Sequence, residues 1–246
     1  MPKSFLIDTS RCTACRGCQL ACKEWKELPA NKTKQTGTHQ NPPDLNPNNY
    51  KVVRFREHLE DGVVRWYFFP DQCRHCIDPP CVAEGSNYVE GAFIHDAGTG
   101  AVIYTDKTRQ VSAEDFESIR SACPYEIPRR DPVTGLIGKC DMCYDRITRG
   151  MLPACVKVCP TGAMNFGERE EMLALAEKRL ARVKKEHPNA MLADPADVNV
   201  IYLLMDDPMK YHDYAVAMFR PGLDRKAFLA KLGAPLRNSI RSIWTI

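Results

Sequence analysis

The stretch Cys12-Thr-Ala-Cys15-Arg-Gly-Cys18-Gln-Leu-Ala-Cys22 decides how this chain is interpreted, because its spacing is C-x2-C-x2-C-x3-C. Three closely spaced thiolates of this pattern wrap one [4Fe–4S] cube. The last thiolate lies a helical turn further along and ligates a second cube. The first cube therefore needs a fourth ligand from a distant part of the chain.

A complementary donor is the segment Cys155-Val-Lys-Val-Cys159-Pro160, which follows Cys140-Asp-Met-Cys143. If the two segments exchange their last ligands, each of two cubes receives four thiolates. The first predicted ligand set is Cys12, Cys15, Cys18 and Cys159, and the second is Cys22, Cys140, Cys143 and Cys155.

An incomplete copy of the same pattern begins at Cys73-Arg-His-Cys76-Ile-Asp-Pro-Pro-Cys81, where Gly85 stands in place of a fourth cysteine. The crossover rule gives a third predicted set of Cys73, Cys76, Cys81 and Cys123. Three cubes then use all 12 cysteines of the chain, with none left over. The sequence therefore predicts three [4Fe–4S] cubes.

The ligands of a fourth cube are all missing. Counting back from Cys123 by the same spacing reaches Ile119, Phe116 and Ala113, which cannot bind iron. Ser112 before this segment is typical of a helix N-cap, and residues at steps of three share a helix face. We expect the apolar side chains of this helix to fill the space of the missing cube.

Composition limits the other possibilities. The chain has 246 residues and a net charge of +3, so no basic field predicts binding to nucleic acid. Each oxidised cube with its thiolates carries about −2, which would make the loaded protein acidic. The longest apolar run, 198–205, is far shorter than the roughly 20 residues of a membrane span, and residues 1–11 lack the pattern of a secretory signal. We expect no direct membrane span.

Two other uses of the cysteines remain as alternatives. A disulfide framework is typical of small secreted domains rather than of a chain this long. A structural zinc site could combine Cys73 and Cys76 with Cys140 and Cys143, but it would leave eight cysteines unexplained. The sequence contains no phosphate-binding loop or nucleophile motif, so it predicts one-electron transfer and no active site of its own.

The predicted fold class is α+β, with two intertwined ferredoxin-like lobes in a pseudo-twofold arrangement. Residues 1–28 and 136–167 form the first lobe with two cubes, and 66–135 form the second lobe with one cube and one vacated site. Residues 29–65 form a loop and hairpin insertion, and 168–246 form a C-terminal extension. Hairpins are expected at 51–56 with 63–69 and at 92–95 with 101–105, a helix at 168–185, a strand at 198–205 and a last helix at 224–242.

Over roughly residues 5–170, the motifs resemble the electron-transfer beta subunits of molybdenum or tungsten bis-pterin oxidoreductases. The resemblance rests on the cysteine motifs together with 122–128 (Ala-Cys-Pro-Tyr-Glu-Ile-Pro), 139–146 (Lys-Cys-Asp-Met-Cys-Tyr-Asp-Arg) and 159–163 (Cys-Pro-Thr-Gly-Ala). Within this family, Cys22-Lys23-Glu24-Trp25 is similar to the version in formate dehydrogenase beta subunits, and the soluble three-cluster type of sulfate-reducing bacteria is the best match.

This resemblance implies an iron–sulfur subunit that conducts electrons from formate oxidation in a large catalytic subunit, in a heterodimer or higher assembly, to a soluble acceptor such as a multihaem cytochrome c. The tungsten or molybdenum bis-pterin cofactor belongs to that partner, with which this chain would be exported to the periplasm; a cytoplasmic location is the alternative. Three alternative functions remain. The chain could be a beta subunit of a dimethyl sulfoxide, polysulfide or tetrathionate enzyme, a beta subunit of a hydrogenase, or a free-standing polyferredoxin.

The resemblance also implies an order of cubes, in which the Cys12 set faces the catalytic subunit, the Cys22 set follows and the Cys73 set is third. We expect electrons to leave from the third cube to a protein that docks near Arg74, Lys107 or Arg109. Cations beside the ligands could raise the cluster potentials, and His75 could tune the third cube. These cations are Arg11, Arg16, Lys23, Arg74, Lys139 and Lys157.

Overall fold

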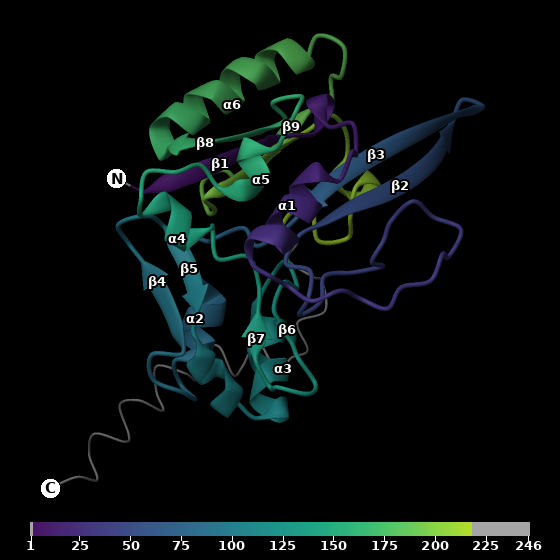
Figure 1. The fold of residues 1–246 in the computed structure, drawn as a ribbon. Helices are drawn as coiled ribbons and strands as arrows, with labels where there is room; N and C mark the ends of the chain where they lie inside the picture. The colour runs from purple at the N-terminus through teal and green to yellow at the C-terminus, as the bar shows by residue number, and fades with distance from the viewer. Residues whose placement is uncertain (1, 218–246) are drawn as a thin grey trace, which may run out of the picture.

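The computed structural model describes residues 2–217, which contain a four-stranded sheet, three two-stranded hairpins and a set of mostly short helices (Figure 1). The sheet has the order β8-β1-β10-β9. Its strands are β1 (Lys3–Asp8), β8 (Met164–Glu168), β9 (Met191–Ala193) and β10 (Val200–Leu204). The central pair, β1 and β10, is parallel, and both outer pairs are antiparallel. The mixed helix and sheet content confirms the predicted α+β class.

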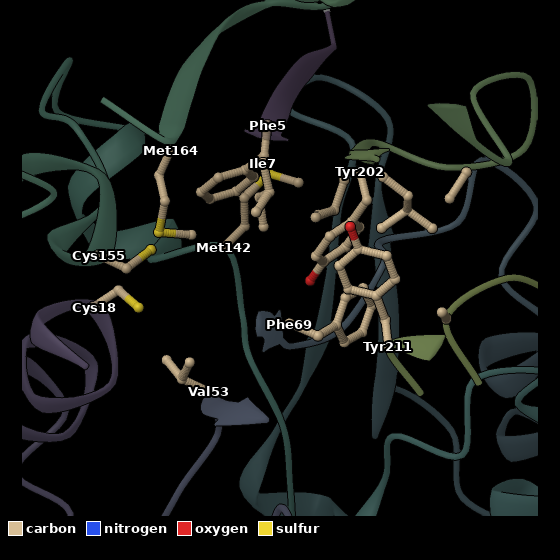
Figure 2. Packing of buried hydrophobic residues seen from close by; sticks show 14 of the residues in the cluster. Phe5, Ile7, Cys18, Val53, Phe69, Met142, Cys155, Met164, Tyr202 and Tyr211 are labelled. Atoms are coloured by element: carbon tan, nitrogen blue, oxygen red, sulfur yellow. The ribbon is translucent and has the colours of Figure 1, made fainter. Parts of the chain in front are cut away.

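The two central strands are buried on both faces, which is why they consist of nearly continuous apolar residues. Alternate side chains point to opposite faces. Leu6 and Ile201 pack against helix α6 (Arg169–Val183), which covers one face of the sheet (Figure 1). Phe5, Ile7 and Tyr202 pack on the other face, toward the cysteine-bearing segments (Figure 2). The sheet is therefore the platform on which the first cysteine motifs rest.

The predicted helix at 168–185 and strand at 198–205 are confirmed as α6 and β10. Their position was not anticipated, because β10 pairs with β1 from the start of the chain. Residues assigned to a C-terminal extension thus complete the same sheet as the first lobe. The helix expected at 224–242 lies outside the described residues.

Both expected hairpins are confirmed, as β2 (Val52–Glu60) with β3 (Val63–Asp71) and as β4 (Phe93–Asp96) with β5 (Ala101–Tyr104). The first is longer than predicted and extends away from the sheet (Figure 1). A third hairpin joins β6 (Arg129–Arg130) to β7 (Ile137–Gly138). The short helices are α1 (Gly17–Trp25), α2 (Pro80–Gly85), α3 (Ala113–Ala122), α4 (Tyr144–Ile147) and α5 (Ala154–Lys157), with 3₁₀ turns at Thr9–Arg11, Asp106–Gln110 and Pro208–Lys210.

The polar segment between α1 and β2 is a long loop, as predicted, and side chains attach it to the rest of the chain. Asp44 in the loop forms ion pairs of 2.6 Å with both Arg54 and Arg129. The side-chain amide of Gln19 on α1 donates to the carbonyl of Asn41 at 2.8 Å. Its oxygen accepts from the backbone N–H of Val53 at 3.0 Å. These bonds join α1, the loop and β2 into one packed unit.

The region in which the sequence predicts that a fourth cube is missing is a small apolar core. Ser112 caps α3 by accepting the N–H of Asp115 at 3.0 Å, as predicted, and Phe116 and Ile119 are buried with Phe93. Ala113 is exposed, so its predicted place in this core is wrong; it lies in the first turn of α3, directly after the cap. The position of the absent cysteine is tightly packed, since a Cβ on Gly85 would lie 2.4 Å from the Phe93 ring.

No helix within residues 2–217 is long and apolar enough to cross a membrane.

The packing at Gly85 generates a stability prediction. We expect Gly85→Ala to lower the midpoint of thermal unfolding, measured anaerobically by circular dichroism. The clash with Phe93 should cost about 1–3 kcal/mol, more than the helix propensity of alanine returns. Gly98→Ala is the matched control, because its nearest side-chain atom would be a carboxylate oxygen at 3.7 Å. An unchanged midpoint for Gly85→Ala would contradict the packing described here.

Candidate iron–sulfur centres

The first predicted ligand set surrounds one pocket. Cys12, Cys15, Cys18 and Cys159 all line it, together with Thr161. Cys12 follows the 3₁₀ turn after β1, Cys18 lies in the first turn of α1, and Cys159 follows α5. Ala14 and Arg16 have positive φ of 53° and 61°, so the chain curls tightly around the pocket between these cysteines. The structure thus brings the distant Cys159 to the three local thiols.

The thiols of this pocket differ in their surroundings. Burial raises the pKa of Cys12 to about 11, although the N–H of Ala14 works in the other direction. Burial also opposes ionisation of Cys159, but the N–H groups of Met164, Thr161 and Ala163 outweigh it and lower the pKa of this thiol. Cys15 is exposed. A cube held here would therefore have one thiolate near the protein surface and one supported by several backbone donors.

The second set is buried. Cys22 lies one turn after Cys18 on α1, and Cys155 lies on α5, which packs against α1. Cys140 and Cys143 flank Met142, whose φ of 65° turns the chain back. Burial raises the pKa of Cys140 well above its usual value, and the nearby Cys22, Cys143 and Cys155 thiols raise it further. The four thiols therefore form one electrostatically coupled group.

The third set lines a second pocket, which contains Cys73, Cys76, Cys81 and Cys123. His75 has a φ of 48°, and its N–H donates to the Cys73 sulfur at 3.4 Å. Cys123 caps the end of α3, and burial raises its pKa to about 12. The His75 ring is fully buried, with Nδ1 accepting from the N–H of Val102 at 2.9 Å. Its position fits a supporting rather than a ligating role.

The arrangement of the thiols distinguishes between the three uses of cysteine. All 12 cysteines are free, and none is joined in a disulfide. The zinc alternative requires Cys73 and Cys76 to share a site with Cys140 and Cys143. The structure instead places Cys73 and Cys76 around the pocket that also contains Cys81 and Cys123.

The thiols of the first and third sets line pockets and do not converge on a single point. In the part of the chain that the structure describes, no three His, Cys, Asp or Glu side chains converge as around a single metal ion. In a cube, each of four thiolates binds a different iron, so four thiols around a pocket fit a [4Fe–4S] cube. The residues present therefore fit the group. Iron would supply the positive charge that these buried thiols need to ionise, and the cube would carry single electrons.

One predicted docking residue is not at the surface. Arg74 is only 2% exposed, because its guanidinium pairs with Asp71 at 3.0 Å and lies 4.5 Å from the centre of the Tyr202 ring. Arg74 therefore offers no exposed charge to a partner that docks nearby. Lys107 and Arg109 are exposed, as a docking role would require.

The remaining cations beside the ligands divide into three groups by burial. Arg11 and Lys157 are exposed, Arg16 and Lys23 are half-buried, and Lys139 is buried. Lys51 is a further buried cation that no sequence pattern predicts; it is 1% exposed, and its charge favours the thiolates of Cys18 and Cys155. No motif identifies it, because it lies 22 residues or more from any cysteine in the sequence and only the fold brings it to them.

The comparisons with known proteins agree with this geometry. Residues 64–169 match the family of 4Fe-4S dicluster domains. The chain is 63% identical to the formate dehydrogenase 2 subunit beta (cytochrome c-553) of Nitratidesulfovibrio vulgaris over 87% of this chain and 99% of that protein. It is 56% identical to a formate dehydrogenase subunit beta of Megalodesulfovibrio gigas over 88% of this chain and all of that protein. It is 38% identical to the formate dehydrogenase-O iron-sulfur subunit of Escherichia coli over 84% of this chain and 69% of that protein.

The exchange of ligands between the motifs can be tested with two variants. Cys155→Ala should remove the cube of the second set and leave the cube of the first set, so that about a third of the iron is lost. Cys159→Ala, the matched control four residues away, should do the reverse. Iron content and electron paramagnetic resonance (EPR) of the anaerobically purified protein measure both. Loss of the first-set cube in Cys155→Ala would reverse the assignment.

Proposed function

The chain belongs to the family of formate dehydrogenase beta (iron–sulfur) subunits, and we propose that it conducts electrons from formate oxidation in a larger catalytic subunit to a soluble acceptor through three [4Fe–4S] cubes. The observation that carries the proposal is the grouping of all twelve cysteines into three sets of four. The partner would hold the tungsten or molybdenum bis-pterin cofactor and perform the reaction on formate. This chain would only transfer electrons.

The proposed order of the cubes follows from shared elements. Helix α1 carries Cys18 of the first set and Cys22 of the second, one turn apart, and α5 carries Cys155 of the second set just before Cys159 of the first. Lys139, next to Cys140 of the second set, lines the pocket of the third. The second cube would therefore lie between the other two, and an electron would pass along all three.

The proposed entry point is the first cube. Cys15 is the one thiol of the described chain classed as exposed, and the neighbouring Leu20 and Val158 are 62% and 43% exposed. A catalytic subunit that covered this surface would bury apolar area and bring its own cofactor near the first cube. The exit would be the third cube, with Lys107 and Arg109 as docking cations.

Two further expectations belong to this proposal. The pseudo-twofold relation of two lobes is supported by α1 and α2, since Gly85 follows Cys81 on α2 by the same four residues as Cys22 follows Cys18 on α1. The proposed location is the periplasm, reached together with the catalytic subunit, and the cytoplasm is the alternative. The proposed acceptor is a multihaem cytochrome c; the name of the Nitratidesulfovibrio vulgaris relative includes cytochrome c-553.

Native anaerobic purification tests the proposal. We expect a large subunit to co-purify and this chain to hold about twelve irons. The separated chain should not reduce a dye with formate, and adding the large subunit should restore that activity. Formate oxidation by this chain alone, or iron for a stable fourth cube, would contradict the proposal. Fractionation of the cells before purification tests the location.

The exit is tested by reversing charges. The double variant Lys107→Glu, Arg109→Glu should slow electron transfer to the physiological acceptor, with the largest effect at low salt, because exposed charges steer docking and are screened by ions. Dye reduction by the complex should stay unchanged. Lys34→Glu, in the loop between α1 and β2, is the control. Equal slowing by the control would place the docking surface elsewhere.

A further inference from the structure

Two lysines of this chain are buried among its cysteines. Lys51 precedes β2 and is 1% exposed, and Lys139 follows β7 and is 5% exposed. Lysine is almost never fully buried unless its charge is compensated. Within residues 2–217, neither side chain forms an ion pair with a carboxylate. Their bonding partners are neutral, so their charge needs compensation from another source.

The contacts of Lys51 place it between the first and second ligand sets. Its ammonium donates to the side chain of Gln72 and, at 3.4 Å, to the carbonyl of Pro70, a residue that lines the pocket of the first set. The next residues along β2 extend the same contacts. Val52 packs in a cluster with Cys140 of the second set, and Val53 lines the first pocket.

The contacts of Lys139 place it between the second and third sets. Its ammonium donates to the carbonyl of Cys140 at 3.0 Å and to that of Val102 at 2.5 Å. It also lies 4.5 Å from the centre of the Tyr104 ring. Lys139, Tyr104 and Val102 all line the pocket of the third set. Each gap between successive ligand sets thus holds one buried ammonium group.

Other cations near the thiols differ from Lys51 and Lys139, because they are either exposed or paired with a carboxylate. Arg74 is buried, but Asp71 neutralises it at 3.0 Å. Lys26 pairs with Asp141 and Asp145, both at 2.7 Å. Lys157 lies between two ligands in the sequence and is exposed, so water screens its charge. A cation acts most strongly where it is both desolvated and without a protein counter-charge, which describes Lys51 and Lys139.

We propose that Lys51 and Lys139 compensate the negative charge of the cubes on either side of them and thereby raise the reduction potentials of these cubes. Reduction adds one electron to a cube that is already negative, and a fixed cation nearby stabilises the reduced form. Because each lysine lies in one gap, the first cube depends on Lys51 and the third on Lys139. The second cube, between them, depends on both.

The test is a redox titration monitored by EPR on the anaerobically purified full-length chain, in the complex in which it is isolated. Lys51→Met should lower the potentials of the first and second cubes and leave the third unchanged. Lys139→Met should lower the third and second and leave the first. We expect at least a tenfold loss in the reduction equilibrium constant, which is 59 mV for one electron. Cys15→Ser and Cys81→Ser assign the signals of the first and third cubes.

Three controls separate tuning from folding. Lys157→Met removes an exposed cation beside two ligands and should leave all potentials unchanged. Lys51→Arg keeps the charge and should retain potentials close to those of the unmodified protein. Lys51→Gln removes the charge but keeps a hydrogen-bond donor, and it replaces the methionine variant if that protein does not assemble.

The inference rests on the proposed three cubes, so iron content is measured first. A low iron content in the unmodified protein would refute the proposed function itself. Full iron content with unshifted potentials in Lys51→Met and Lys139→Met would overturn the inference alone. Equal shifts of all three cubes in either variant would also overturn it, as would loss of the cubes in both Lys51→Met and Lys51→Gln, because the lysine would then act on assembly rather than on potential.

Discussion

The structure depends on bringing cysteines from distant segments together around shared pockets, as Cys159 joins Cys12, Cys15 and Cys18, and Cys123 joins Cys73, Cys76 and Cys81. Burial opposes the ionisation of a thiol, and the negative charge of neighbouring thiolates opposes it further. Both effects raise the pKa values of Cys22 and Cys140. Protonated thiols can pack in a core as small apolar groups, so the grouping of thiols around shared pockets, and not their burial, is what fits a bound cluster. Backbone N–H groups at Cys159 lower the pKa of its thiol and so lessen the cost of ionisation.

Both the cysteine motifs and the sheet position the thiols of these sites. Tight turns with positive φ, at Ala14, His75 and Met142, set the local spacing of the thiols. The face of the sheet that carries Phe5 and Tyr202 supports α1 and α5, on which the first two sets converge (Figure 2). Helix α6 covers the opposite face, so the cysteine-bearing segments pack on a sheet whose two central strands are buried.

The region around α2 and α3 is packed as an apolar core. Phe93, Phe116 and Ile119 pack together where a fourth cube would be expected, and Gly85 leaves room for the Phe93 ring. Apolar burial supplies stability there without any cofactor.

Features that rest on short-range spacing can be predicted from the sequence alone. The local cysteine clusters, the two hairpins and α6 follow from cysteine steps, turn residues and apolar periodicity, which act over a few residues. Only the tertiary structure decided the parallel pairing of β10 with β1, the burial of Arg74 against Asp71, the exposure of Ala113 and the position of Lys51. The burial and the pairings arise from contacts between segments that can be far apart in the chain. The desolvation of a charged side chain depends on all of its neighbours at once. No local sequence pattern encodes either of these.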